Sequence, residues 1–222
     1  MTALAAPPSP PVVESRGAPA LRVYRDDGPL AQVLGATLGR ALPVVPAALL
    51  VAAALPAAAV IAVDGADAPD GLVAAAVAWI VLLGGASGGR PHEAGTSWLA
   101  PPLLRAIEYA TIIWLAALAG AEDEGAAFAL LAALAFRHYD LTYRLRHRGA
   151  IPPAWLNRLA GGWEGRLIAV WALGLAGALP TALYVLATAF AVLFVTECVH
   201  SWTHLGRGPR PMLYDDEGDE GL

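Results

Sequence analysis

The chain has 222 residues, of which 57% are hydrophobic and 15% are charged, and its formal net charge is −5 at pH 7. This composition is typical of an integral membrane protein, because its apolar runs are longer than most helices buried in a soluble core. The acidic residues lie mainly in loops and in the C-terminal segment, so the charge gives no reason to expect a nucleic-acid partner. A single cysteine, Cys198, excludes an internal disulfide framework and a multi-cysteine metal site.

The N-terminal segment has no apolar core of the kind found in a cleavable signal peptide. Residues 1–20 are rich in Pro and Ala, and we expect them to be disordered. Residues 21–40 combine apolar residues with several arginines, a pattern that favours an amphipathic or juxtamembrane helix. A transmembrane domain is predicted over residues 41–204, and an acidic disordered tail over residues 205–222.

Apolar runs divide the predicted transmembrane domain into six helices, some of them shorter than the roughly 20 residues that a span needs. The predicted spans are Ala41–Val63, Leu72–Ala86, Trp98–Gly120, Ala126–Leu145, Leu167–Leu179 and Thr181–Trp202. One alternative concerns Pro180, because residues 167–202 could instead form one long broken helix. The expected fold is therefore an all-α, polytopic membrane bundle of about six transmembrane helices.

The arginines predict the orientation of this bundle. All 14 basic residues are arginines, and none of them falls in the first, third or fifth connection. Because basic residues near helix ends remain in the cytoplasm, we expect both termini to be cytoplasmic. The absence of lysine and the abundance of Ala, Arg, Gly and Pro are typical of a GC-rich bacterial genome, so the expected location is a bacterial cytoplasmic membrane.

Charged residues enter the predicted spans at their cytoplasmic ends. The fourth span contains the polar stretch Arg137–Arg144, and the third span carries Arg105 and Glu108 at i, i+3 spacing. Charges at this depth are costly unless they are paired or hydrated, so they indicate a functional site. The competing interpretation is a set of neutralising ion pairs, or of arginines that reach lipid phosphates.

Several guanidinium groups beside a few carboxylates suit a phosphate-bearing ligand, because arginine can bind phosphate through two N–H groups at once. We expect these groups, together with Glu197, to converge in one water-accessible cavity that opens to the cytoplasm. The predicted ligand-binding residues are Arg90, Arg105, Glu108, Arg137, His138, Asp140, Arg144, Glu164 and Arg166. The candidate acid/base residues of an enzyme are His138, Asp140, Glu93 and Glu108.

The last predicted span carries a candidate metal stripe, formed by Glu197, His200 and His204. Glu-x-x-His spacing places a carboxylate and an imidazole one turn apart, as in carboxylate-bridged metal sites, although a second such motif is missing. The stripe would take Mg²⁺ or another divalent ion, and the alternative is an ordinary set of interfacial side chains. The sequence contains no Gly-x-x-x-x-Gly-Lys loop, Gly-x-Ser-x-Gly elbow or His-Glu-x-x-His motif.

Three segments resemble a bacterial membrane domain of unknown function that is often found behind a sugar-nucleotidyltransferase-like unit and a CDP-alcohol phosphatidyltransferase unit. They are Trp98–Tyr109, Phe136–His147 with its Arg-His-Tyr-Asp element, and Gly162–Arg166 with Trp-Glu-Gly-Arg. The resemblance extends from about Leu21 to His204. It implies an association with phospholipid synthesis and a CDP-alcohol phosphatidyltransferase as a partner, but it carries over no catalytic residue.

The chain lacks the Asp-x-x-Asp-Gly-x-x-Ala-Arg motif of those transferases, so it is not expected to be such an enzyme itself. We expect an accessory module that binds an anionic lipid or a phosphorylated headgroup at the inner leaflet. The first alternative is a headgroup phosphotransferase or hydrolase. The second is a small-ion or proton-coupled transporter, which is disfavoured because only Pro46 and Pro56 interrupt the apolar middle of the spans. A homo-oligomer is compatible with each of these functions.

Overall fold

The regular secondary structure of the computed structural model is helical throughout residues 21–89, 96–120, 124–148 and 151–205, which are the residues that it describes. The α-helices are α1 (Pro29–Leu34), α2 (Pro46–Val63), α3 (Asp70–Ala86), α4 (Ala100–Leu118), α5 (Glu124–Arg148), α6 (Ala154–Leu159), α7 (Gly162–Leu175) and α8 (Leu179–Leu205). Shorter helical turns are η1 (Leu21–Arg25), η2 (Gly35–Gly39), η3 (Gly65–Asp67), η4 (Ser87–Gly89) and η5 (Ser97–Leu99). The prediction of an all-α fold is confirmed for this part of the chain.

Each of the predicted spans corresponds to a helix, but the helices differ in how well they suit a membrane. Within the described residues, four segments are long and apolar enough to cross one: Pro46–Val63, Asp70–Gly89, Ser97–Leu118 and Leu179–Thr203. By contrast, α5 has 25 residues but carries the charged stretch in its second half. With 14 residues, α7 is shorter than the roughly 20 that a span requires.

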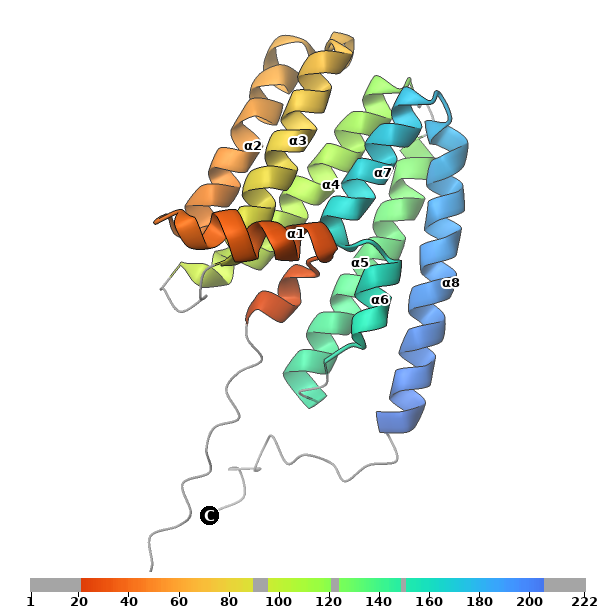
Figure 1. Cartoon of the computed structure of the whole chain (residues 1–222). Helices are drawn as coiled ribbons and strands as arrows, with labels where there is room; N and C mark the ends of the chain where they lie inside the picture. Colours follow the sequence, from red (N-terminus) through yellow and green to blue (C-terminus); the bar gives the residue numbers. More distant parts are fainter. Residues whose placement is uncertain (1–20, 90–95, 121–123, 149–150, 206–222) are drawn as a thin grey trace, which may run out of the picture.

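The chain reverses direction between α7 and α8. Gly177 adopts a left-handed conformation with φ of 66° in this turn, which glycine adopts without steric cost. Pro180 lies in the first turn of α8, where its missing N–H group would have no helical partner anyway. The two helices then lie side by side (Figure 1). The alternative of one long broken helix over residues 167–202 is therefore wrong.

The segment before α2 crosses the bundle instead of extending α2. Figure 1 shows α1 lying across the long helices, and it contacts both α3 and α7. A close approach at Gly39 makes this crossing possible, because a Cβ atom there would lie 2.1 Å from the carbonyl oxygen of Ala86. The residues just before α1 turn into the bundle, and Arg25, Asp26 and Asp27 are all buried.

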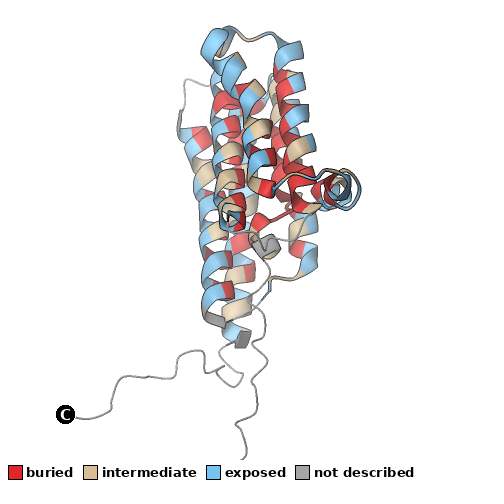
Figure 2. Ribbon diagram, turned by 90° about the vertical axis from the view of Figure 1, so that its left-hand side faces the viewer, coloured by how far each residue is buried: buried red, intermediate tan, exposed pale blue. Residues whose placement is uncertain are grey.

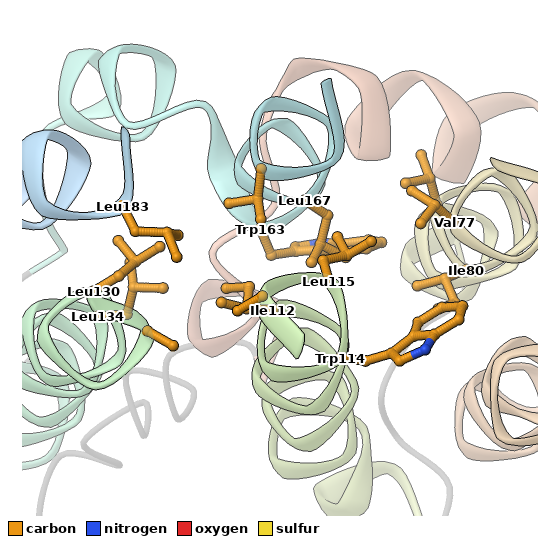
Figure 3. Close-up of a cluster of buried hydrophobic side chains, with 14 of the residues drawn as sticks. Val77, Ile80, Ile112, Trp114, Leu115, Leu130, Leu134, Trp163, Leu167 and Leu183 are labelled. Carbon is orange, nitrogen blue, oxygen red and sulfur yellow. The ribbon is translucent and has the colours of Figure 1, made fainter. Parts of the chain in front are cut away.

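The core consists of large apolar side chains on the facing sides of α3, α4, α5, α7 and α8. The side chains labelled in Figure 3 are Val77, Ile80, Ile112, Trp114, Leu115, Leu130, Leu134, Trp163, Leu167 and Leu183. The outward faces are exposed (Figure 2), yet they carry large apolar residues such as Val63, Phe128 and Val192. An apolar outer surface of this extent is costly in water but suits a lipid environment.

Candidate functional site

The charged residues that the sequence places near the helix ends form two buried networks. We call the first the N-terminal network; it consists of Arg25, Asp26, Asp27, Arg105, Glu108 and Arg166. We call the second the α5–α8 network; it consists of Arg137, Asp140, Arg144 and Glu197. Both combine local ion pairs with ion pairs between segments that are far apart in the sequence.

In the N-terminal network, Arg166 joins α7 to α4 and to the segment before α1. Its Nε atom donates to Glu108 Oε1 at 2.7 Å, and its Nη1 atom donates to Asp26 Oδ2 at 3.0 Å. Arg105 donates to the second oxygen of Glu108, at 2.7 Å. Glu108 is fully buried, so two guanidinium groups compensate one carboxylate away from water.

Arg25 and Asp27 attach the N-terminal segment to α3 and α7. Arg25 donates from Nε to Asp27 Oδ2 at 2.9 Å, from Nη1 to Ser87 Oγ at 3.0 Å and from Nη2 to the Gly84 carbonyl at 2.8 Å. The indole N–H of Trp163 donates to Asp27 Oδ1 at 2.9 Å. These bonds satisfy polar groups that would otherwise be unpaired in the interior.

Asp26 remains ionised in this environment. Burial alone would raise the pKa of the Asp26 carboxyl, because it disfavours the charged form. The positive charge of Arg166 overcomes burial, with smaller contributions from the His138 imidazole and then from Arg105 and Arg137, and holds the pKa of Asp26 well below its usual value. The carboxylate therefore retains its ion pair throughout the physiological pH range.

Glu164, which was predicted to bind a ligand, holds the start of α1 instead. Its Oε2 atom accepts a hydrogen bond from the Gly28 N–H and its Oε1 atom accepts one from the Ala31 N–H, both at 3.0 Å. These N–H groups lack helical partners at a helix N-terminus, where a negative charge is also favourable. Gly162 allows the two segments to touch, because a Cβ atom there would lie 2.1 Å from the Gly28 nitrogen.

In the α5–α8 network, Arg144 binds two carboxylates. Its Nε atom donates to Asp140 Oδ2 at 2.8 Å, its Nη1 atom donates to Glu197 Oε1 at 2.9 Å, and its Nη2 atom donates to both residues. The other oxygen of Asp140 accepts hydrogen bonds from Trp202 Nε1 at 3.1 Å and from Cys198 Sγ at 3.2 Å. Asp140 thus has a partner for each of its oxygens inside the bundle.

Arg137 joins α5 to α6 and α8 within the α5–α8 network. Its Nη2 atom donates to Asn157 Oδ1 of α6 at 3.1 Å, and its Nη1 atom lies 3.9 Å from Glu197 Oε2. The guanidinium group also lies over the Phe194 ring, 5.6 Å from the ring centroid, which is close enough for a cation–π interaction. Helix α6 was not predicted from the sequence, and it supplies the amide that binds Arg137.

Each network balances its charges. The N-terminal network has three arginines and three carboxylates, and the α5–α8 network has two of each. The residues that were predicted to converge lie close together. Five of them, however, are no more than 5% exposed: Glu108, Arg137, Asp140, Arg166 and Glu197. The expectation that they all line one open cavity is wrong, because their charged groups are directed at one another.

An open cavity of about 370 Å³ borders only the edge of the N-terminal network. It lies between η1, the start of α4 and the middle of α5, and its lining includes Arg105 and His138. The side chains of Arg105 and His138 are 13% and 14% exposed. Arg105 donates to Glu108 and to the carbonyls of Tyr24 and Arg25, and these bonds involve three of the five N–H groups of a guanidinium.

His138 connects this cavity to two other polar groups. Its Nδ1 atom lies 2.7 Å from the hydroxyl oxygen of Tyr109, and its Nε2 atom lies 3.8 Å from Asp26 Oδ2. The nearby carboxylate favours a proton on Nε2, so Tyr109 donates its hydroxyl hydrogen to Nδ1. Among the described residues predicted to bind a ligand, Arg105 and His138 are those that border this cavity.

The remaining predicted residues are placed differently. Arg90 and Glu93 lie outside the described residues, as does the side chain of His204. Glu197 accepts from Ser201 at 2.5 Å as well as from Arg144, and His200 is exposed on α8. Over the residues that the structure describes, no group of three or more His, Cys, Asp or Glu side chains could hold a metal ion.

Sequence reasoning missed Asp26 and Asp27, although they are central to the N-terminal network. Both precede Gly28 and Pro29, a pattern typical of an exposed helix start, and nothing in the sequence indicated that the segment turns inward. The available signal was charge balance, because two acidic residues follow Arg25 in a segment whose other charged residues are arginines.

Comparison with known proteins places the chain in a family without assigning it an activity. A model of a family of unknown function, DUF5941, matches residues 15–220, which include both networks and the cavity. A search of the curated proteins and a search of the solved structures each find no match. The predicted resemblance to a domain of unknown function is confirmed, and the chain belongs to the DUF5941 family.

Proposed function

We propose that this protein is an accessory module of lipid synthesis in the bacterial cytoplasmic membrane, and that it binds the phosphate of an anionic lipid headgroup beside Arg105 and His138. The observation that carries the proposal is the cavity at these two residues, where the side chain of Arg105, a member of the N-terminal network, remains partly exposed. An arginine N–H group can donate to a phosphate oxygen, and the charges on both groups strengthen that hydrogen bond. The other buried arginines then hold the helices together.

The proposed orientation places this cavity at the cytoplasmic surface. Arginine-free connections lie at the opposite end of the helices, and arginine-rich sides stay in the cytoplasm. Trp98 lines the cavity and is 62% exposed, as expected for a tryptophan at a membrane interface.

A labelling experiment tests this orientation. In a Cys198→Ser background, a cysteine that replaces Asp67 should react with an impermeant thiol reagent added outside the cell. Labelling of Asp67→Cys only after permeabilisation would reject this orientation.

Two substitutions test phosphate binding at the cavity. Arg105→Lys keeps the charge, but Glu108 and the two backbone carbonyls that bind Arg105 can take up all three N–H groups of lysine, which leaves none for a phosphate. Retention of phosphatidylglycerol in native mass spectrometry should therefore fall about tenfold, corresponding to about 1.4 kcal/mol. Thr142→Trp fills the cavity from an exposed position on α5 and should weaken retention without touching an ion pair. Ala135→Trp is the matched control, because Ala135 is also exposed on α5 but does not line the cavity. Unchanged retention in Arg105→Lys and Thr142→Trp would refute the proposal.

A catalytic role is the second candidate, and the position of His138 favours it. This residue borders the cavity and lies between a phenol and a carboxylate, an arrangement suited to proton transfer. Of the other acid/base candidates, Glu108 and Asp140 are engaged by arginines, and Glu93 lies outside the described residues.

An assay separates the accessory role from the catalytic one. The purified protein is given Mg²⁺ and lipid-linked phosphates, with and without a CDP-alcohol phosphatidyltransferase. Turnover by the transferase that rises when this chain is added supports the accessory module. Turnover by this chain alone, abolished in His138→Ala, would establish the enzyme and contradict our proposal.

A further inference from the structure

An apolar groove lies on the other side of α4 from the cavity. It has a volume of about 360 Å³ and is lined by α2 and α4, with Ile80 of α3 at its base. The polar residue in its lining is Thr111, whose hydroxyl donates to the Ile107 carbonyl at 2.7 Å. The groove therefore offers an occupant apolar contacts and no hydrogen-bonding group that needs a partner.

We propose that this groove holds an acyl chain of the lipid whose phosphate enters the cavity. The ligand would then be a membrane phospholipid and not a water-soluble phosphate compound. This inference rests on the proposed function, because the cavity supplies the headgroup site. It goes further in requiring that the ligand carry a hydrocarbon chain.

The length of the groove suits a chain of one leaflet. On α2 the lining extends from Leu50 to Ile61. At 1.5 Å per residue this distance is about 17 Å, close to half of the roughly 30 Å hydrocarbon core. On α4 the lining begins at Leu103, in the first turn of the helix, so the groove starts near the same membrane surface as the cavity.

The groove is long and apolar. Its lining extends over about three turns of α2, so an extended hydrocarbon chain can lie along it.

The cavity and the groove flank the same turns of α4. Pro102 and Arg105 line the cavity, whereas Leu103 and Ala106 line the groove. Pro102 and Ala106 are both exposed and lie one turn apart. A lipid can therefore cross α4 over two small side chains, with its headgroup in the cavity and its chain in the groove.

The groove should contribute modestly to affinity. A lipid chain leaves surroundings as apolar as the groove, so the transfer provides no hydrophobic driving force, and the gain comes from packing alone. We therefore expect filling of the groove to reduce lipid retention about threefold to tenfold, a smaller effect than complete loss of the phosphate contact.

The test fills the groove without changing the cavity. Ala58→Phe and Ala110→Phe each place a ring in the groove from an exposed position, and Ala59→Phe is the matched control because Ala59 is exposed on α2 but does not line it. Native mass spectrometry measures retention of dioleoyl phosphatidylglycerol, and glycerol 3-phosphate serves as the soluble probe. Both groove variants should retain less lipid than Ala59→Phe while melting at the same temperature.

A diazirine in the acyl chain of the same lipid provides a readout that needs no substitution. Its crosslinks should fall within Pro46–Val63 and Ala100–Leu118. Normal retention in both groove variants, or crosslinks confined to other helices, would overturn the acyl-chain site while Arg105→Lys still weakens binding. Equally tight binding of glycerol 3-phosphate would overturn it too. An Arg105→Lys protein that binds both probes normally would instead refute the proposed function.

Discussion

The buried arginines and Arg105 differ in what surrounds them, although all belong to the same bundle. Arg144 and Arg166 are 2% exposed, and each binds two carboxylates. Arg105 binds one carboxylate and two backbone carbonyls, and it borders an open cavity. The comparison teaches that an arginine in a membrane segment indicates a ligand site only after its internal partners have been counted.

The largest effect should follow loss of Arg166. Arg166→Met would remove the guanidinium group that donates to Asp26 and would leave Glu108 with Arg105 as its one arginine partner. Both carboxylates lie in the interior. Breaking a buried pair in this way typically costs about 3–5 kcal/mol, so the variant should unfold far below the wild-type temperature. Arg158→Met is the control, because Arg158 is exposed on α6 and its loss should change stability by less than about 0.5 kcal/mol. Similar melting of the two variants in detergent would show that the N-terminal network does not hold the bundle together.

A smaller effect is expected in the α5–α8 network. Asp140→Asn removes one of the two carboxylates that bind Arg144, but Glu197 remains. The expected cost is about 1.5–3 kcal/mol, the range for a lost hydrogen bond to a charged group. Asp67→Asn should be neutral, because Asp67 is exposed in the α2–α3 connection. Chemical denaturation of both variants measures the difference, and an equal loss of stability would contradict the distinction between buried and exposed acids.

The pH dependence of Asp26 sharpens the comparison further. Because folding lowers the pKa of this carboxyl, its contribution to stability is full above its ordinary pKa of 3.8 and is lost as the pH falls toward the lower pKa of the folded state. Protonated Asp26 resembles Asn, so the difference in melting temperature between wild type and Asp26→Asn should be several degrees at pH 7 and should narrow below about pH 4. A difference that stays constant from pH 7 to pH 3 would show that Asp26 is not held as a carboxylate by its arginines.

Local spacing predicted part of the polar architecture. The Arg105–Glu108 and Asp140–Arg144 pairs lie at i, i+3 and i, i+4, and both form as helix geometry requires. The helices themselves followed from the apolar runs. Sequence spacing could not identify the partners of Arg166 and Arg144 on other helices, because Asp26 is 140 residues from Arg166 and Glu197 is 53 residues from Arg144.

Those distant pairs decide which arginines are available to a ligand. The sequence therefore predicted where charge gathers but not how it is neutralised. Helix α6 was missed for a related reason, because its six residues are too few to show a helical period, and only Leu156 among them is buried.

One paired measurement tests the central claim most directly: lipid retention and melting temperature, determined together for Arg105→Lys and Arg166→Lys. If Arg105 faces a ligand and Arg166 holds the fold, Arg105→Lys should lose about tenfold in phosphatidylglycerol retention with little change in melting, because lysine can keep the internal partners of Arg105 but then has no N–H group left for a phosphate. Arg166→Lys should melt at a much lower temperature, since lysine cannot bridge Glu108 and Asp26 as the guanidinium does. A protein in which Arg105→Lys retains lipid normally and Arg166→Lys melts normally would contradict the account.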